Sequence, residues 1–231
     1  MKIRGFQKLT LVDYPNQMAA ILFTGGCDFR CPFCHNGELV LHPSLTPEIP
    51  ESEVFSYLEK RKGLLDGVVV SGGEPTLADD LDEFLSSLKK MGYLVKLDTN
   101  GSRPEVLSRI VSEKLVDYVA MDIKNSFERY PETVGFPKYD TSNVSRSISF
   151  LLSGQVDYEF RTTCVKELHD EKSFHSIGKI VEGAERYYLQ NFVPNENTIS
   201  KDCSPCSMED LVKYSEILRN YIGNVQIRDM A

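Results

Sequence analysis

Three cysteines stand close together in the segment GGCDFRCPFCHNGE, which runs from residue 25 to residue 38. Cys27, Cys31 and Cys34 have the spacing C-x3-C-x2-C. Thiolates at this spacing can bind three irons of a [4Fe-4S] cluster, a group that usually takes four cysteine ligands. The fourth iron would then have no protein ligand and could bind another molecule. The spacing therefore predicts an enzyme whose cluster has an open coordination site.

A zinc site and a disulfide pair are the alternatives for the same cysteines. Structural zinc sites use four protein ligands, and His35 could supply the fourth. His35 directly follows Cys34, however, and is poorly placed to complete the same tetrahedron. Six cysteines in a chain without a predicted export signal favour metal or catalytic use over a disulfide framework. The spacing favours the cluster, with zinc as the remaining alternative.

Composition and charge narrow the class of protein. The chain has 231 residues, so one domain over residues 1–231 is expected. Its net charge of -8 argues against a nucleic-acid partner, because such binding depends on Lys and Arg contacts to phosphates. No apolar stretch is long enough to span a membrane, and the first residues lack the apolar core of a signal peptide. We expect a cytoplasmic protein with no membrane partner.

Short apolar runs alternate with helical patterns along the chain. Apolar runs without strict alternation are typical of strands buried on both faces of a parallel sheet. Strands are predicted near 18–23, 67–70, 94–97, 118–121, 158–165, 187–190 and 225–227. Helices are predicted near 54–58, 81–90, 103–113, 141–153 and 171–182, and from a capping box at 207–210 towards Gly223. Gly92 fits the C-terminal cap of the second helix.

About six strand–helix units result. A full eight-unit barrel typically takes about 250 residues, so this chain is slightly short for one. We therefore predict an α/β fold with a partial (β/α)6 TIM-like barrel, open on one side. A doubly wound sheet is the alternative, and in both cases ligands bind at the carboxyl ends of the strands. Two polar loops, 125–140 and 194–206, stand out, and the first is a candidate docking surface near the barrel mouth.

Polar or glycine-rich segments follow several expected strands at that same edge. They are SGGEP at 71–75, DTNG at 98–101 and DIK at 122–124. Gly72 and Gly73 would let a ligand approach the backbone closely. Asp98 and Asn100 could bind hydroxyls or an amine, although such a segment alone is more often a turn. Their shared placement predicts one binding site more strongly than any single motif does.

Together these motifs resemble the radical S-adenosylmethionine (SAM) superfamily. They are most similar to its branch of glycyl-radical-enzyme activating proteins. The segments FQKLTLVDYPNQMAAILFTGGCDFRCPFCHN, MDIKNSFERYPETVGF and YLQNF resemble the anaerobic ribonucleoside-triphosphate reductase activating proteins. The resemblance covers nearly the whole chain.

The resemblance assigns cofactor roles to residues of this sequence. It implies that Cys27, Cys31 and Cys34 hold the cluster, and that the amine and carboxylate of SAM bind the open iron. The SAM contacts it implies are Phe33 near the adenine, Gly72, Gly73 and Glu74 for the methionine ammonium, Asp98, and Lys124 and Arg161 for the carboxylate or ribose. It also implies a monovalent cation near Asp98, Thr99 and Asp122. Gln190 stands in the region where related activators carry a histidine that meets SAM, and could replace it.

The activity implied is reductive cleavage of SAM, followed by hydrogen abstraction from a glycine of a partner enzyme. No catalytic side chain beyond the cluster and SAM is required. Anaerobic ribonucleotide reductase is the expected partner, and a flavodoxin- or ferredoxin-like protein the expected electron donor. The alternatives are activation of another glycyl radical enzyme such as formate lyase, a small-molecule reaction like that of 7-carboxy-7-deazaguanine synthase, and a zinc-binding interaction module.

The histidines outside the triplet segment show no ligand-like spacing, and the options for the remaining C-x-x-C pair are a second metal site, a redox pair or no role. Cys203 and Cys206 form a C-x-x-C pair, which is too few thiolates for a closed zinc or cluster site. We interpret the pair as having no essential role. Cys164 is expected to pack as a small apolar residue. The histidines expected at the surface are His42, His169 and His175.

Overall fold

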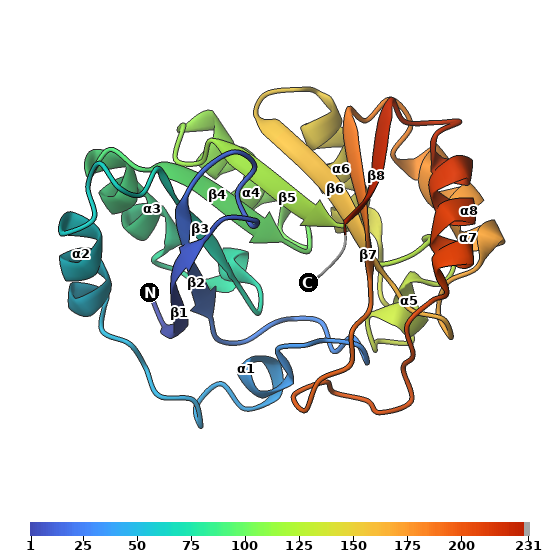
Figure 1. Cartoon of the computed structure of the whole chain (residues 1–231), viewed down its shortest axis with the longest axis horizontal. Coiled ribbons are helices and arrows are strands. Elements are labelled where there is room, and N and C mark those ends of the chain that lie inside the picture. The colour runs from blue at the N-terminus through green and yellow to red at the C-terminus, as the bar shows by residue number, and fades with distance from the viewer. Residues whose placement is uncertain (229–231) are drawn as a thin grey trace.

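The computed structural model describes residues 1–228, which form one curved eight-stranded sheet with helices on its outer side (Figure 1). The strands lie across the sheet in the order of the sequence. Their bounds are β1 Ile3–Thr10, β2 Ala19–Thr24, β3 Gly67–Gly72, β4 Leu94–Thr99, β5 Tyr118–Asp122, β6 Asp157–Cys164, β7 Arg186–Asn191 and β8 Asn224–Arg228. β1 is antiparallel to β2, and every later neighbouring pair is parallel.

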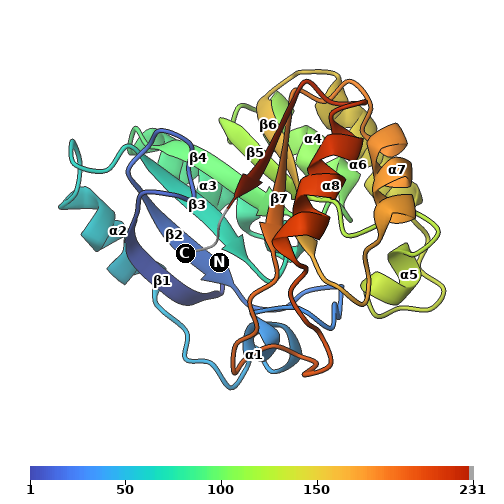
Figure 2. The ribbon, with the colours of Figure 1, turned by 45° about the vertical axis from the view of Figure 1, so that its right-hand side comes forward.

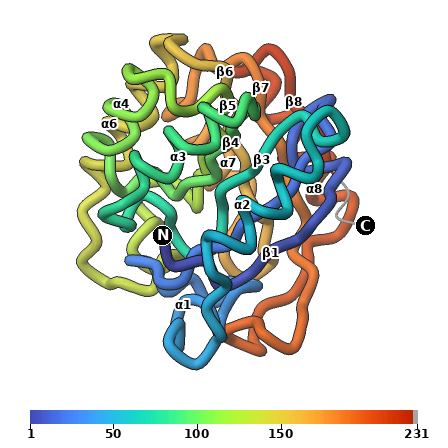
Figure 3. The backbone as a smooth tube through the Cα atoms, turned by 90° about the vertical axis from the view of Figure 1, so that its left-hand side faces the viewer, coloured from blue at the N-terminus to red at the C-terminus, as the bar shows by residue number. Residues whose placement is uncertain are grey.

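The sheet curves like a barrel wall, with β1 and β8 as its two edges in the described part of the chain. Figures 2 and 3 show both edges flanking the same side of the molecule. Six strand–helix units lead from β2 to β8. The prediction of a partial (β/α)6 barrel, open on one side, is therefore confirmed, and the flat doubly wound alternative is wrong.

Most helices cover the convex face of the sheet (Figure 1). Their bounds are α1 Gly37–Leu41, α2 Glu51–Glu59, α3 Leu81–Lys90, α4 Pro104–Ser112, α5 Tyr130–Thr133, α6 Ser142–Leu152, α7 Glu171–Ile180 and α8 Met208–Leu218, with a 3-10 turn η1 at Pro75–Leu77. The cap predictions are confirmed, because Gly92 has φ +89 just after α3 and the Ser207–Asp210 capping box opens α8. None of the helices within residues 1–228 is long and apolar enough to cross a bilayer.

Three elements were missed by the sequence analysis. β1 has an irregular, largely half-buried or exposed pattern, and it forms by pairing with β2 rather than by its own apolar alternation. α1 and α5 have only five and four residues, too short for a helical period to emerge. Of these, α1 follows the cysteine loop directly, and α5 lies within the predicted polar loop 125–140.

The two faces of the parallel strands carry different side chains. On β4, Val95 and Leu97 belong to the main apolar core, whereas Lys96 ion-pairs with Asp98 in the barrel interior. At the amino ends of the strands a second apolar cluster includes Tyr14 and Tyr118, whose ring centroids are 5.9 Å apart. Polar side chains of the strands, such as Lys96 and Asp98, therefore lie in the barrel interior near the carboxyl ends of the strands.

One histidine prediction is wrong. His169 is only 3% exposed, whereas His42 and His175 are exposed as predicted. His169 Nδ1 accepts a hydrogen bond from Val165 N at 3.0 Å, and its Nε2 lies 2.9 Å from Lys124 O. Burial lowers the pKa of His169, which suits a neutral ring that accepts at Nδ1 and donates at Nε2. His169 therefore supports the backbone of Lys124 and is not a surface residue.

The cysteines outside the triplet lie around the end of β6. Cys164 is fully buried, as predicted for a small apolar residue. Cys206 is also buried, and its backbone exchanges two hydrogen bonds of 2.9 Å with the side chain of Asn191. Cys203 is half-buried in the same loop. The loop between β7 and α8 is thus tied to the sheet through its C-x-x-C segment.

Candidate functional site

One cavity at the carboxyl ends of the strands is lined by every residue that the sequence assigned to a cofactor. These residues are Cys27, Cys31, Phe33, Cys34, Gly72, Gly73, Glu74, Asp98, Thr99, Asn100, Asp122, Lys124, Arg161 and Gln190. The cavity is also lined by residues for which no cluster or SAM contact was predicted: Asp13, Phe29, His35, Asn36, Val40, Ser71 and Thr163. The rule that parallel strands end at a common edge brought these separate motifs together.

The cysteine loop after β2 is held by segments far away in the sequence. Arg30 N donates to Val134 O at 2.8 Å, just after α5. Ser200 N donates to Pro32 O at 2.7 Å, and Gly37 N donates to Asn197 O at 3.1 Å. Both predicted polar loops therefore brace the cysteine loop. In the first of them, only residues 135–138 form a continuous exposed stretch near its end.

The three thiols suit a positively charged metal group. Burial raises the pKa of Cys27 and of Cys31 to about 12, and it also raises the pKa of Cys34. A bound cation favours the thiolate that such burial disfavours. Soft sulfur ligands select iron–sulfur clusters or zinc.

The number of possible ligands bears on this choice. Structural zinc sites use four protein ligands. In a cluster each thiolate binds a different iron, so the sulfurs need not converge on one point. The three cysteines that line the cavity are ligands of the type that a [4Fe-4S] group takes.

The glycine turn after β3 lies directly against the cysteine loop. Gly72 has φ +125, and a Cβ there would be 2.1 Å from Thr24 N. A Cβ at Gly73 would be 1.8 Å from Gly26 O. The Asn36 amide adds a hydrogen bond of 3.1 Å to Gly72 O. These glycines are needed for packing between two loops, a requirement beyond the ligand access that the sequence suggested.

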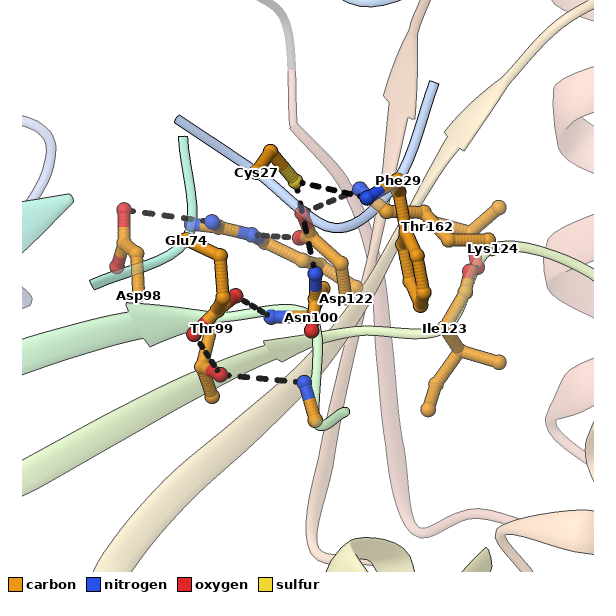
Figure 4. A network of polar contacts seen from close by, with 12 residues as sticks. Cys27, Phe29, Glu74, Asp98, Thr99, Asn100, Asp122, Ile123, Lys124 and Thr162 are labelled. Atoms are coloured by element: carbon orange, nitrogen blue, oxygen red, sulfur yellow. Dashed lines mark hydrogen bonds and ion pairs between the residues drawn. The ribbon is translucent and has the colours of Figure 1, made fainter. Parts of the chain in front are cut away.

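Glu74 joins the ends of β3 and β4 (Figure 4). Its Oε1 accepts hydrogen bonds from Thr76 N at 3.1 Å and from Thr99 Oγ1 at 2.8 Å, and its Oε2 accepts one from Asn100 N at 2.7 Å. Burial raises the pKa of Glu74 to about 7, although these hydrogen bonds act in the opposite direction. The carboxylate is thus committed to the two turns, and its predicted contact with SAM stays a prediction.

The Glu74→Gln variant should remove a pH dependence of stability. A carboxyl whose pKa is raised on folding stabilises the fold most at low pH, and this contribution is lost as pH rises from about 4.3 through 7. Across that window wild-type stability should fall by roughly 3–4 kcal/mol relative to the variant. Urea unfolding between pH 4 and pH 8 measures the difference. The exposed Glu83→Gln variant serves as the control, and parallel profiles for wild type and Glu74→Gln would contradict the assignment.

Three cations and two carboxylates form a chain of ion pairs across the cavity. Asp98 contacts Lys96 at 2.5 Å and Arg161 at 3.3 Å. Asp122 contacts Arg161 as well, and Lys124 at 2.7 Å. Because the cations exceed these carboxylates by one charge, the group suits an anionic ligand such as a carboxylate.

Burial and charge oppose each other in this group. Burial alone would raise the pKa of Asp122, but the charges of Arg161 and then Lys124 outweigh it and hold that pKa well below its ordinary value. The pKa of Asp98 is lowered in the same way, with Arg161 as the strongest opposing charge. A monovalent cation at these carboxylates would have to share them with bound lysine and arginine side chains. That cation site stays a prediction.

Aromatic groups form another part of the wall. Phe33 is 4% exposed, and Lys124 Nζ lies 5.9 Å from its ring centroid. The ring of His35 stacks on Phe192, with centroids 5.3 Å apart. Gln190, on β7, lines the cavity from the side opposite to the glycine turn. The contacts of Phe33 and Gln190 with SAM remain predictions.

The sequence has clear relatives. Residues 21–172 match the Radical SAM superfamily. The chain is 33% identical to a proposed glycyl-radical enzyme activating enzyme of Methanocaldococcus jannaschii, with 98% of this chain and 95% of that protein covered. It is also 30% identical to the pyruvate formate-lyase-activating enzyme of Staphylococcus aureus, with 64% of this chain and 62% of that protein covered.

Solved structures share the fold. A radical SAM methyltransferase from Sphaerobacter thermophilus superposes with a TM-score of 0.74 at 15% identity, over 96% of this chain and 68% of that chain. A domain of the pyruvate-formate lyase-activating enzyme from Bacteroides vulgatus gives a TM-score of 0.57 at 18% identity, over 70% of this chain and 98% of that chain. At such identities the likeness concerns the fold.

Proposed function

We propose a protein substrate for this chain, which belongs to the radical SAM superfamily and to its branch of glycyl-radical-enzyme activating enzymes. The proposed substrate is an anaerobic ribonucleotide reductase. The chain is an enzyme whose cofactors are a [4Fe-4S] cluster and SAM, as in its superfamily. The opening segment and MDIKNSFERYPETVGF resemble activators of that reductase, and this resemblance supports the choice of partner. A flavodoxin- or ferredoxin-like electron donor and a cytoplasmic location complete the proposal.

The observation that supports this activity best is the convergence of all predicted cofactor residues on one cavity. When bound, the cluster and SAM supply a one-electron reductive cleavage that produces a radical able to abstract hydrogen. Cys27, Cys31 and Cys34, which line the cavity, would hold the cluster. Lys124 and Arg161 would bind the carboxylate or ribose of SAM.

The protein would position the reactants and exclude water. Phe33 and the partly buried ion pairs would replace solvent around the bound cofactor. The side of the barrel between β1 and β8 is open, and Asp13 of the β1–β2 hairpin reaches the same cavity. An opening of this kind would admit a loop of a partner protein that carries the target glycine.

Anaerobic mixing with the reductase tests the partner. The reconstituted chain, dithionite, SAM and the reductase should give the EPR doublet of a glycyl radical. A reductase whose target glycine is replaced with alanine is the control and should give no doublet. Formate lyase is the second candidate partner, because the Staphylococcus aureus activating enzyme of formate lyase is 30% identical. A doublet on formate lyase alone would select that partner, and SAM cleavage without a radical on either protein would favour a small-molecule substrate.

A further inference from the structure

The side-chain amide of Asn100 points at the sulfur of Cys27 (Figure 4). Asn100 follows β4 and is 5% exposed. Its Nδ2 lies 3.7 Å from Cys27 Sγ and 3.0 Å from Asp28 Oδ1. The two hydrogens of the amide therefore have two acceptors, one of which is the sulfur of a predicted cluster ligand.

The other polar groups of Asn100 have partners that can act only as a donor or only as an acceptor. Its Oδ1 accepts a hydrogen bond from Ser102 N at 2.8 Å. Its backbone N–H donates to Glu74 Oε2 at 2.7 Å. The orientation of an asparagine amide is assigned from such a network. Because the Ser102 N–H can only donate, the oxygen of Asn100 faces Ser102 and the nitrogen faces Cys27.

Cys27 also receives a backbone hydrogen bond. Phe29 N lies 3.3 Å from Cys27 Sγ. The sulfur is thus approached by one N–H of its own loop and by one N–H from the end of β4. The second donor links the cysteine loop to a turn that lies more than seventy residues further along the chain.

We propose that Asn100 raises the reduction potential of the cluster by donating a hydrogen bond to the Cys27 thiolate. Hydrogen bonds to the sulfurs are among the factors that set the potential of an iron–sulfur cluster. Reduction adds a negative charge to the cluster and its thiolates, so an N–H aimed at sulfur stabilises the reduced form more than the oxidised form. Asn100 is therefore a positioning residue that acts through Cys27. This inference rests on the cluster and not on the identity of the partner.

The Asn100→Ser variant provides the test. A serine hydroxyl can still accept from the N–H two residues on and keep the turn, but it is too short to reach Cys27. The cluster is titrated by EPR-monitored reduction without SAM or partner. At a fixed ambient potential, the ratio of reduced to oxidised cluster should fall about tenfold, which corresponds to about 59 mV for one electron.

Asn143→Ser is the matched control, because Asn143 Nδ2 donates to Ser102 O at 3.1 Å and supports the same turn without contacting the sulfur. Its potential should equal that of the wild type. An unchanged potential in Asn100→Ser, or an equal shift in both variants, would overturn the proposal.

A second measurement needs no variant. Wild-type protein labelled with ¹⁵N in asparagine side-chain amides should show a weak nitrogen coupling to the reduced cluster by pulsed EPR. Its absence would also overturn the proposal. Because neither experiment includes a glycyl radical enzyme, a wrong partner assignment leaves both results unaffected.

Discussion

Replacing Cys31 with alanine is expected to remove the cluster and to stop the reductive cleavage of SAM. Cys31 is 6% exposed and lines the cavity beside the other two cysteines of the triplet. Loss of a group that merely supports a metal ligand typically costs about 10- to 100-fold in affinity or activity. Loss of a ligand should therefore lower release of 5′-deoxyadenosine under dithionite by more than about 100-fold. Iron content by chelation and product by chromatography measure the two effects.

Cys203→Ala is the matched control. Cys203 is half-buried in the loop before α8 and does not line the cavity. Its iron content and SAM cleavage should equal those of the wild type, as expected if the C-x-x-C pair has no essential role. A Cys31→Ala protein that kept its iron and its activity would exclude the triplet as the cluster site. Stoichiometric zinc in the wild type, without iron, would instead support the interaction module.

The Arg161→Leu variant should lose roughly 3–5 kcal/mol of stability at neutral pH. Arg161 is paired with both Asp98 and Asp122, and all three side chains are largely buried. Its removal leaves two carboxylates with less compensating charge in a site that water reaches poorly. Urea unfolding of the cluster-free proteins measures the loss. Arg109→Leu is the control, because Arg109 makes a similar pair with Asp82 but is 47% exposed and should cost less than about 1 kcal/mol.

The stability lost in the Arg161→Leu variant should be smaller in acid than at neutral pH. In the wild type the pKa values of Asp98 and Asp122 are lowered, so their contribution is present above the unfolded pKa of about 3.9 and is lost as pH falls below it. Without the charge of Arg161, less opposes the effect of burial, which raises the pKa of Asp98 and of Asp122. Both carboxyls then take up protons more readily. The difference between wild type and variant should therefore be smaller at pH 4 than at pH 7. An equal difference at both pH values would mean that Arg161 acts by packing alone.

Much of the site was predictable because it depends on local patterns and on one topological rule. The cysteine spacing, the SGGEP turn and the DTNG turn are each readable in a few residues. Apolar runs located the strands, and the carboxyl-end rule then brought the motifs to one edge. The main fold and the residues predicted to line the cavity followed from these steps.

The interactions that were missed depend on contacts between distant residues. Lys96 reads as an interruption in an apolar strand, and only the curvature of the sheet shows that it meets Asp98 in the interior. Asn36 and His169 bond to backbone oxygens of Gly72 and Lys124, which no spacing rule reveals. β1 likewise exists through its pairing with β2. Side chains that support a site from a distance leave little local signal.

The distant contacts of the cysteine loop bear on how the protein matures in the cell. The cysteines leave the ribosome long before Asn197 and Ser200, which hold Gly37 and Pro32. At a synthesis rate of about 5–20 residues per second, the thiols wait roughly ten to thirty seconds for these contacts. We therefore expect iron and sulfide to be bound stably only after the segment around residue 200 has been synthesised, and the thiols of the nascent chain to need a reducing environment until then.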